Sequence, residues 1–119
     1  SLFGQGWASE QPGSVLEFDV PGSAVSVLFH RIKGPMGIAR ARVDDRDPVT
    51  LDAWFSADWG GYSVNQLIAR DLGPGKHRLR IELTAERAQA SEGHRFHLQA
   101  VLAAGLPDAP PDVSNSPTN

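Results

Sequence analysis

The chain has 119 residues, 40% hydrophobic and 21% charged, which suits a single globular domain. Eleven Lys and Arg against fourteen Asp and Glu give a net charge of -3, whereas nucleic-acid-binding domains usually carry a strongly basic surface, so we expect no nucleic-acid partner. The lack of cysteine excludes disulfides and thiolate zinc sites. No apolar run approaches the roughly 18 residues of a membrane helix. We therefore expect no membrane partner and no signal peptide, and secretion or the periplasm stays open as the location.

Short segments of alternating polarity, separated by Gly and Pro, predict an all-β fold. In the first of them, Leu16, Phe18 and Val20 share one face of an extended chain, and Glu17 and Asp19 share the other. Similar patterns predict strands at residues 15–20, 24–31, 38–44, 49–55, 62–70, 77–83 and 95–102. The sequence therefore predicts an antiparallel β-sandwich of about seven strands.

Three segments fall outside these strands. Trp7 lies in a glycine-flanked stretch that reads as an N-terminal loop, and residues 84–91 favour helix but have no apolar stripe, which predicts one solvated turn. From Gly105 onward, four prolines stand among polar residues, a composition typical of a linker or a frayed terminus. We therefore expect a β-sandwich domain at residues 1–104 and a proline-rich tail at 105–119.

The sequence offers little for catalysis or for metal binding. It has no G-x-S-x-G elbow and no phosphate-binding loop, so we expect no enzyme, with a triad assembled from distant residues as the alternative. The histidines are His30, His77, His94 and His97, and the last two stand three apart in a strand, which sends their rings to opposite faces. Asp44, Asp45 and Asp47 share one turn, where they bind either calcium or the backbone of that turn. We expect no cofactor, with calcium as the alternative.

Arginines mark the polar face of two predicted strands, at positions 40, 42, 78 and 80. If these strands are neighbours, the side chains form either a basic stripe for an anionic sugar or acidic partner, or a solvated face paired with nearby acids. The acids expected as partners are Glu17, Asp19 and Glu82.

Aromatic residues gather around the Gly60-Gly61 pair and suggest carbohydrate binding. Sugar rings stack their C–H faces on flat aromatic side chains, and polar side chains bind their hydroxyls. The candidate carbohydrate-binding residues are Trp59, Tyr62, Asp58, His30, Arg70 and Trp54, with Asn65 as a further polar group. The alternative for Trp7 and Trp54 is that they fill the ends of the sandwich core, whereas Trp59 lies between Asp and Gly and is expected to be exposed.

Several blocks together resemble a known domain family. They are Gly6-Trp7 with Pro12-Gly13, LEFDVPGSAVSVLF at 16–29, Gly34-Pro35, the turn at 43–48, LGPGKHRL at 72–79 and the last strand after Gly93. In order and spacing, from residue 6 to about 102, they resemble the jelly-roll, galactose-binding-like domain that accompanies the catalytic domain in multidomain SGNH (GDSL-type) esterases. The resemblance implies a jelly-roll sandwich that binds carbohydrate or packs against an esterase domain.

The sequence departs from that family in two ways. Met36 follows the Gly-Pro pair where the family commonly has an acidic residue, and the GDS, G-x-N-D and D-x-x-H motifs of the esterase domain are absent. The first hypothesis is therefore a non-catalytic module that binds a polysaccharide or other glycan. The second is an interaction domain that binds no ligand and docks on the catalytic domain of the same polypeptide, through its arginine-bearing face or its Gly-Pro loop.

Overall fold

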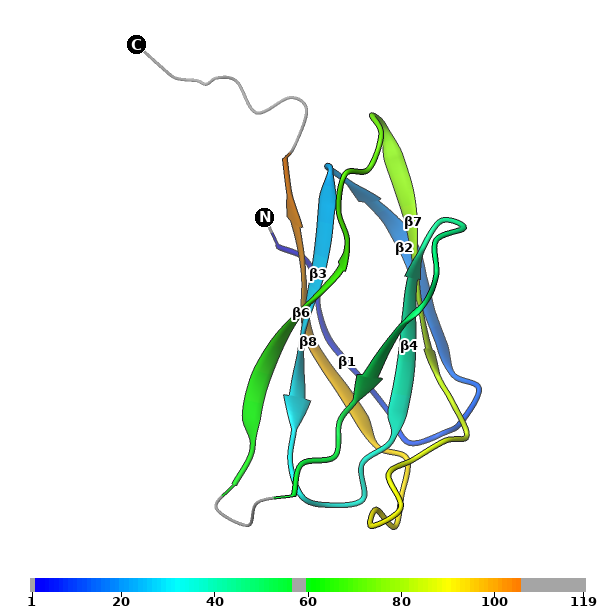
Figure 1. Ribbon diagram of the computed structural model, residues 1–119, viewed down its shortest axis with the longest axis vertical. Helices are drawn as coiled ribbons and strands as arrows, with labels where there is room; N and C mark the ends of the chain where they lie inside the picture. Colours follow the sequence, from blue (N-terminus) through cyan, green and yellow to red (C-terminus); the bar gives the residue numbers. More distant parts are fainter. Residues whose placement is uncertain (1, 57–59, 106–119) are drawn as a thin grey trace.

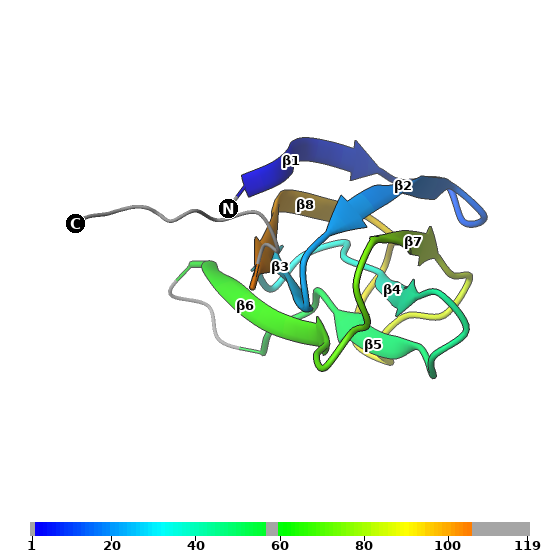
Figure 2. The same cartoon turned by 90° about the horizontal axis from the view of Figure 1, so that it is seen from above.

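The computed structural model describes residues 2–56 and 60–105, which form two packed β-sheets (Figure 1). The strands in chain order are β1 (Leu2–Ser9), β2 (Val15–Pro21), β3 (Ala24–Arg31), β4 (Ile38–Val43), β5 (Val49–Asp52), β6 (Tyr62–Ala69), β7 (Lys76–Leu83) and β8 (Phe96–Ala104). Sheet A has the order β1-β8-β3-β6 and sheet B the order β2-β7-β4-β5, each antiparallel throughout. Viewed along its length, the molecule is a two-layered sandwich (Figure 2). The predicted all-β sandwich with jelly-roll-like strand pairing is confirmed.

All seven predicted strands are present, but the N-terminal segment was wrongly expected to be a loop. Residues 2–9 form β1, which pairs with β8 at the edge of sheet A and places Trp7 opposite Leu98. Glycine has a low strand propensity, and Gly4 and Gly6 hide the alternation that predicted the other strands. Within the described ranges no helix is long and apolar enough to cross a membrane. The predicted tail lies outside the described residues beyond Gly105.

The core lies between the sheets and is built from the inward side chains that the alternation predicted. Fully buried residues of both sheets contribute to it, such as Val27 of β3 and Ile81 of β7. Phe96 of β8 stacks on Phe29 with a centroid distance of 5.6 Å and contacts the half-buried indole of Trp7 at 6.4 Å. The prediction that Trp7 fills an end of the core is therefore confirmed.

Candidate functional site

Two loops lie against each other at one end of the sandwich, shown at the bottom of Figure 1. Residues 32–37 connect β3 to β4, and residues 84–95 connect β7 to β8. The loops exchange backbone hydrogen bonds: Gly37 donates to the carbonyl of Arg95 over 2.8 Å, and Arg95 donates to the carbonyl of Pro35 over 2.9 Å. Gly93 packs so closely that an added Cβ would lie 2.7 Å from the carbonyl oxygen of Pro35. The two loops are therefore joined at backbone distance.

The buried Ser91 also stabilises the contact between the two loops. Its residue is only 3% exposed, and its hydroxyl oxygen lies within hydrogen-bond distance of the carbonyl oxygens of Gly34, Met36 and Gly93. Arg87 in turn donates to the carbonyl of Ser91 over 2.8 Å. These contacts hold the second loop in one position on the first.

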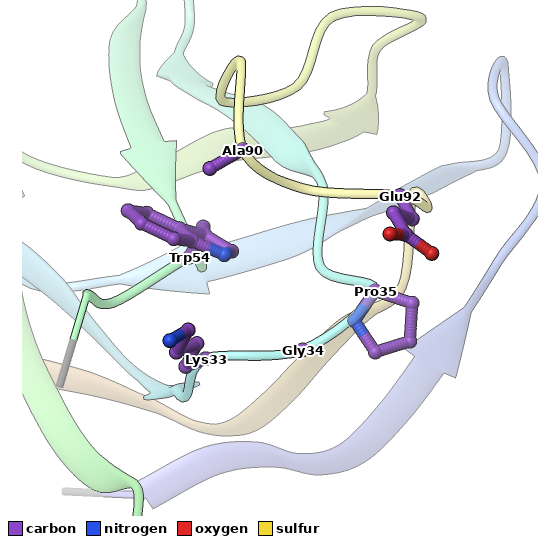
Figure 3. A pocket seen from close by; sticks show the side chains of 6 residues that line it. All are labelled: Lys33, Gly34, Pro35, Trp54, Ala90 and Glu92. Atoms are coloured by element: carbon purple, nitrogen blue, oxygen red, sulfur yellow. The ribbon is translucent and has the colours of Figure 1, made fainter. Parts of the chain in front are cut away.

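An open hollow of about 500 Å³ lies between these loops (Figure 3). Its lining residues are Lys33, Gly34, Pro35, Trp54, Ala90 and Glu92. The half-buried indole of Trp54 packs against the core and also forms one wall of the hollow, with the loop that carries Ala90 close beside it in Figure 3. The hollow thus combines one large aromatic surface with a cationic and an anionic side chain.

Arg31 holds the aromatic residues behind this wall. Its guanidinium donates to the carbonyl of Trp54 over 2.8 Å and to the hydroxyl of Tyr62 over 3.1 Å. The same group lies over the ring of Phe55, 5.6 Å from the centroid, and 6.0 Å from the centroid of Tyr62. Phe55 meets Tyr62 edge to face at 4.8 Å. Arg31 was not among the predicted site residues, although the alternation Val25, Val27, Phe29, Arg31 assigns it to the inward face.

The structure brings together three of the six predicted carbohydrate-binding residues. Trp54, Tyr62 and His30 all lie at the end of the sandwich that carries the hollow. Tyr62 takes part in the Arg31 cluster, and the His30 ring lies against Gly61, where an added Cβ would come within 2.6 Å of it. Of these three residues, Trp54 is the one that lines the hollow.

The other predicted residues are placed differently. Trp59 and Asp58 lie outside the described residues. Arg70 follows the far end of β6, so that eight residues of strand, roughly 26 Å at 3.3 Å per residue, separate it from the Tyr62 end. It is exposed and lies 3.7 Å from the carboxylate of Asp71. Arg70 is therefore too distant to share a small sugar site with Trp54.

The predicted arginine face is an ion-paired surface on sheet B. Arg78 contacts Asp19 at 3.0 Å and Glu17 at 3.2 Å, and Arg80 contacts Glu82 at 3.0 Å. Strands β4 and β7 are neighbours, as the stripe hypothesis required. The alternative of a face paired with its own acids is the one that the structure supports, because exposed arginines already engaged by carboxylates have less charge to offer a ligand.

Asp44, the first aspartate of the turn that suggested calcium, already binds residues of β7. Asp44 has a φ of 52°, and its carboxylate accepts the backbone N–H of Arg78 over 2.8 Å and contacts Nδ1 of His77 at 2.6 Å. These two hydrogen bonds, first that from Arg78, lower the pKa of Asp44. Within the described part of the chain, no group of three or more His, Cys, Asp or Glu residues could hold a metal ion. The carboxylate of Asp44 thus binds β7 rather than the backbone of its own turn.

No family model and no curated protein matches this sequence. Among solved structures, a two-domain esterase active on acetylated mannans, also crystallised with mannopentaose, matches at 26% identity and a TM-score of 0.72 over 84% of this chain. A family two carbohydrate esterase from Cellvibrio japonicus matches 88% at 16% identity and a TM-score of 0.58. Another from Clostridium thermocellum, in complex with cellohexaose, matches 84% at 20% identity and 0.56.

This chain spans only part of each of these proteins. It covers 27%, 30% and 27% of the three esterase chains, respectively. The two family two esterases, at 16% and 20% identity, support the fold alone. The esterase active on acetylated mannans is more similar to this chain in both sequence and structure. The predicted resemblance is confirmed: this chain is similar to a β-sandwich domain of multidomain carbohydrate esterases.

Proposed function

We propose that this domain is a non-catalytic carbohydrate-binding module of a larger carbohydrate esterase. The observation that carries the proposal is the Trp54 hollow, an aromatic wall set between two fastened loops. The likeness of the chain to part of esterases that were crystallised with mannopentaose and cellohexaose supports a polysaccharide as the ligand class.

The hollow suits a sugar chemically. The indole of Trp54 offers a flat surface for the C–H face of a sugar ring, and Lys33 and Glu92 offer a donor and an acceptor for hydroxyl groups. Its volume of about 500 Å³ falls within the roughly 300–1,000 Å³ of small-molecule sites. Because Ser91 and the loop backbone already fix its walls, binding orders few additional groups, which favours affinity. Trp59 and Asp58, close to Trp54 in sequence, are further proposed contributors.

A non-catalytic role agrees with what the chain lacks. The sequence contains none of the three esterase motifs, and the hydroxyl of the buried Ser91 is surrounded by backbone carbonyl groups rather than by a histidine base. We therefore assign any hydrolysis to another part of the polypeptide.

Tryptophan fluorescence during titration with manno- and cello-oligosaccharides tests this function. We expect a saturable change for one glycan class with the native chain. Calorimetry, which does not depend on the tryptophan that is removed, should show binding lost in Trp54→Ala and partly kept in Trp54→Phe, which keeps an aromatic face. Lys33→Ala should weaken binding, whereas Lys76→Ala, another exposed lysine at the start of β7, should not. Circular dichroism should show that each variant is folded.

Two results would overturn the proposal at different levels. Full binding by a folded Trp54→Ala variant would show that the sugar binds elsewhere on the domain. An unchanged signal from the native chain across a broad panel of polysaccharides, checked by calorimetry, would refute the binding function itself.

A further inference from the structure

Each of the two sheets ends in two edge strands, and proteins usually keep such edges from pairing with other molecules. The edge strands are β1 and β6 in sheet A and β2 and β5 in sheet B. The outer backbone N–H and C=O groups of an edge strand can pair with a strand of another molecule. A short strand, a charged side chain, a proline or a break in the extended conformation prevents this pairing. The four edges in the described part of the chain differ in these features.

Three of the four edges carry at least one of these protective features. β5 has only four residues and ends in Asp52. β2 carries the carboxylates of Glu17 and Asp19 and ends at Pro21. β1 contains Gly6, whose φ of 72° lies outside the range of an extended strand. A strand laid along any of these edges would therefore meet a short, charged or interrupted partner.

The fourth edge strand, β6, has none of these features. It has eight residues, and none of them is charged, proline or glycine. Its pairing with β3 is regular from Tyr62 to Leu67, and the register shift follows at Ile68. Figure 2 shows β6 at the end of sheet A, with β3 as its neighbouring strand. β6 therefore presents an extended, uncharged edge that can accept another strand.

The absence of charge on β6 indicates which strand fits beside it. When two copies of one strand pair antiparallel about a two-fold axis, each residue near the axis faces itself or a residue close to it in sequence. A charged strand would therefore set like charges opposite each other, which is destabilising, and β6 has no such charge. The chain as a whole has a net charge of -3, which opposes contact between copies over its charged surfaces. Among the described edges, β6 is thus the one best suited to a second copy of this chain.

Asn65 is the exposed residue of β6 at which the two-fold axis fits best. With the axis there, the pairing spans Tyr62 to Ile68, and Ser63 of each copy lies opposite Leu67 of the other. The two Asn65 side chains then face each other, and an amide can bind its own copy because it both donates and accepts hydrogen bonds. The pairing also covers part of Leu67, whose side chain is 47% exposed.

We propose that β6 pairs antiparallel with β6 of a second copy, with Asn65 at the two-fold axis, and so joins the two A sheets edge to edge. A single pair of strands is a small contact compared with the roughly 1,200–2,000 Å² that stable complexes bury. The dimer is therefore weak and dissociates on dilution. The inference does not depend on the proposed glycan binding, because β6 contributes no residue to the lining of the Trp54 hollow.

Sedimentation velocity of the 119-residue chain at a series of concentrations tests the proposal. The mass should rise from 12.8 kDa toward twice that value between micromolar and millimolar concentration. Asn65→Asp places two carboxylates against each other and should raise the dissociation constant about fivefold or more. Thr50→Asp is the matched control, because it adds the same charge at an exposed residue of the edge strand β5 and should leave the dissociation constant unchanged.

Disulfide formation provides a second test, because the chain has no cysteine of its own. Facing residues of antiparallel strands have Cα atoms about 4.5–5.5 Å apart, which suits a disulfide. Asn65→Cys should therefore oxidise to a covalent dimer, whereas Thr50→Cys should stay monomeric under the same conditions.

The proposal fails if the native chain stays at 12.8 kDa at every concentration. It also fails if the chain associates but Asn65→Cys cross-links no faster than Thr50→Cys, because the contact then lies elsewhere. A mass that grows beyond that of a dimer would overturn it as well, because the contact then does not close on itself. Circular dichroism should show that each variant is folded. None of these results affects the glycan titration, so the two proposals fail separately.

Discussion

His77 and Asp44 join two turns at the end of the sandwich opposite the Trp54 hollow, through a contact of 2.6 Å between Nδ1 and Oδ2. The other ring nitrogen of His77 lies 2.6 Å from the carbonyl oxygen of Gly73. Both nitrogens therefore face acceptors, and only the doubly protonated imidazolium can donate to both. These two hydrogen bonds, first that to Asp44, raise the pKa of His77 above its ordinary value of 6.5.

This arrangement predicts a stability that falls as the pH rises above 6.5. Because the pKa of folded His77 is raised, its stabilising contribution is complete below pH 6.5 and is lost as the pH rises through the folded pKa. The pKa of Asp44 is lowered, so its contribution is present above pH 3.8 and is lost as the pH falls through its folded pKa. Urea unfolding at a series of pH values should show both losses.

Variants of two neighbouring aspartates test this pH dependence, one as the probe and the other as the control. Asp44→Asn should remove most of the loss of stability at rising pH, because the imidazolium loses its anionic partner. Asp45→Asn changes the exposed next residue of the same turn and should leave the pH profile as it is. Identical profiles for the two variants would contradict the role given to Asp44.

Gly61 is expected to resist substitution because two groups press against it. An added Cβ would lie 2.6 Å from the His30 ring and 2.7 Å from the carbonyl oxygen of Arg31, and backbone cannot move as a flexible side chain can. Gly61→Ala should therefore lower the free energy of unfolding by about 1–3 kcal/mol. Gly73→Ala should be neutral or stabilising, because a Cβ added there would have no neighbouring atom within 4 Å. Urea unfolding of both variants measures the difference.

Arg31 is expected to stabilise the end of the sandwich that carries the hollow. Arg31→Met removes the hydrogen bond to Trp54 and the cation over Phe55, and we expect a loss of about 1–3 kcal/mol in the free energy of unfolding. Arg31→Lys should recover little, since an ammonium group cannot reproduce the planar guanidinium contacts. Arg42→Met is the control, because Arg42 is exposed and has no ion pair with the described residues. Equal losses for the Arg31 and Arg42 variants would contradict the prediction.

The sequence predicted the sandwich because its strands follow a local rule. Alternation alone identifies β2 and β7, whose buried and exposed residues follow the two-residue period. It failed for β1, where glycines interrupt the pattern and pairing with β8 supplies the stability. The strand predicted at 49–55 ends at Asp52 as β5. The carboxylate of Asp52 accepts the N–H of Trp54 over 3.0 Å, which turns the chain there.

The candidate site was predictable only in part, because it is formed by segments distant in sequence. Trp54 was selected from its aromatic neighbourhood, but Pro35 and Glu92, which line the same hollow, come from two other loops. The burial of Ser91 could not be predicted, because a serine in a polar connection is usually exposed to solvent and only the fold shows that this one is buried. Arg70 illustrates the converse, because residues near each other in sequence, Tyr62 and Arg70, lie at opposite ends of the extended β6.

Ser91 is predicted to position the hollow without being one of its lining residues. Ser91→Ala removes the buried hydroxyl that meets the carbonyls of Gly34 and Met36, which should cost about 1–3 kcal/mol in the free energy of unfolding. Because Gly34 also lines the hollow, the folded variant should bind the glycan that the native chain selects more weakly. Ser63→Ala, at an exposed serine of β6, should change neither quantity. A variant that loses stability yet binds the glycan with native affinity would show that Ser91 supports only the fold.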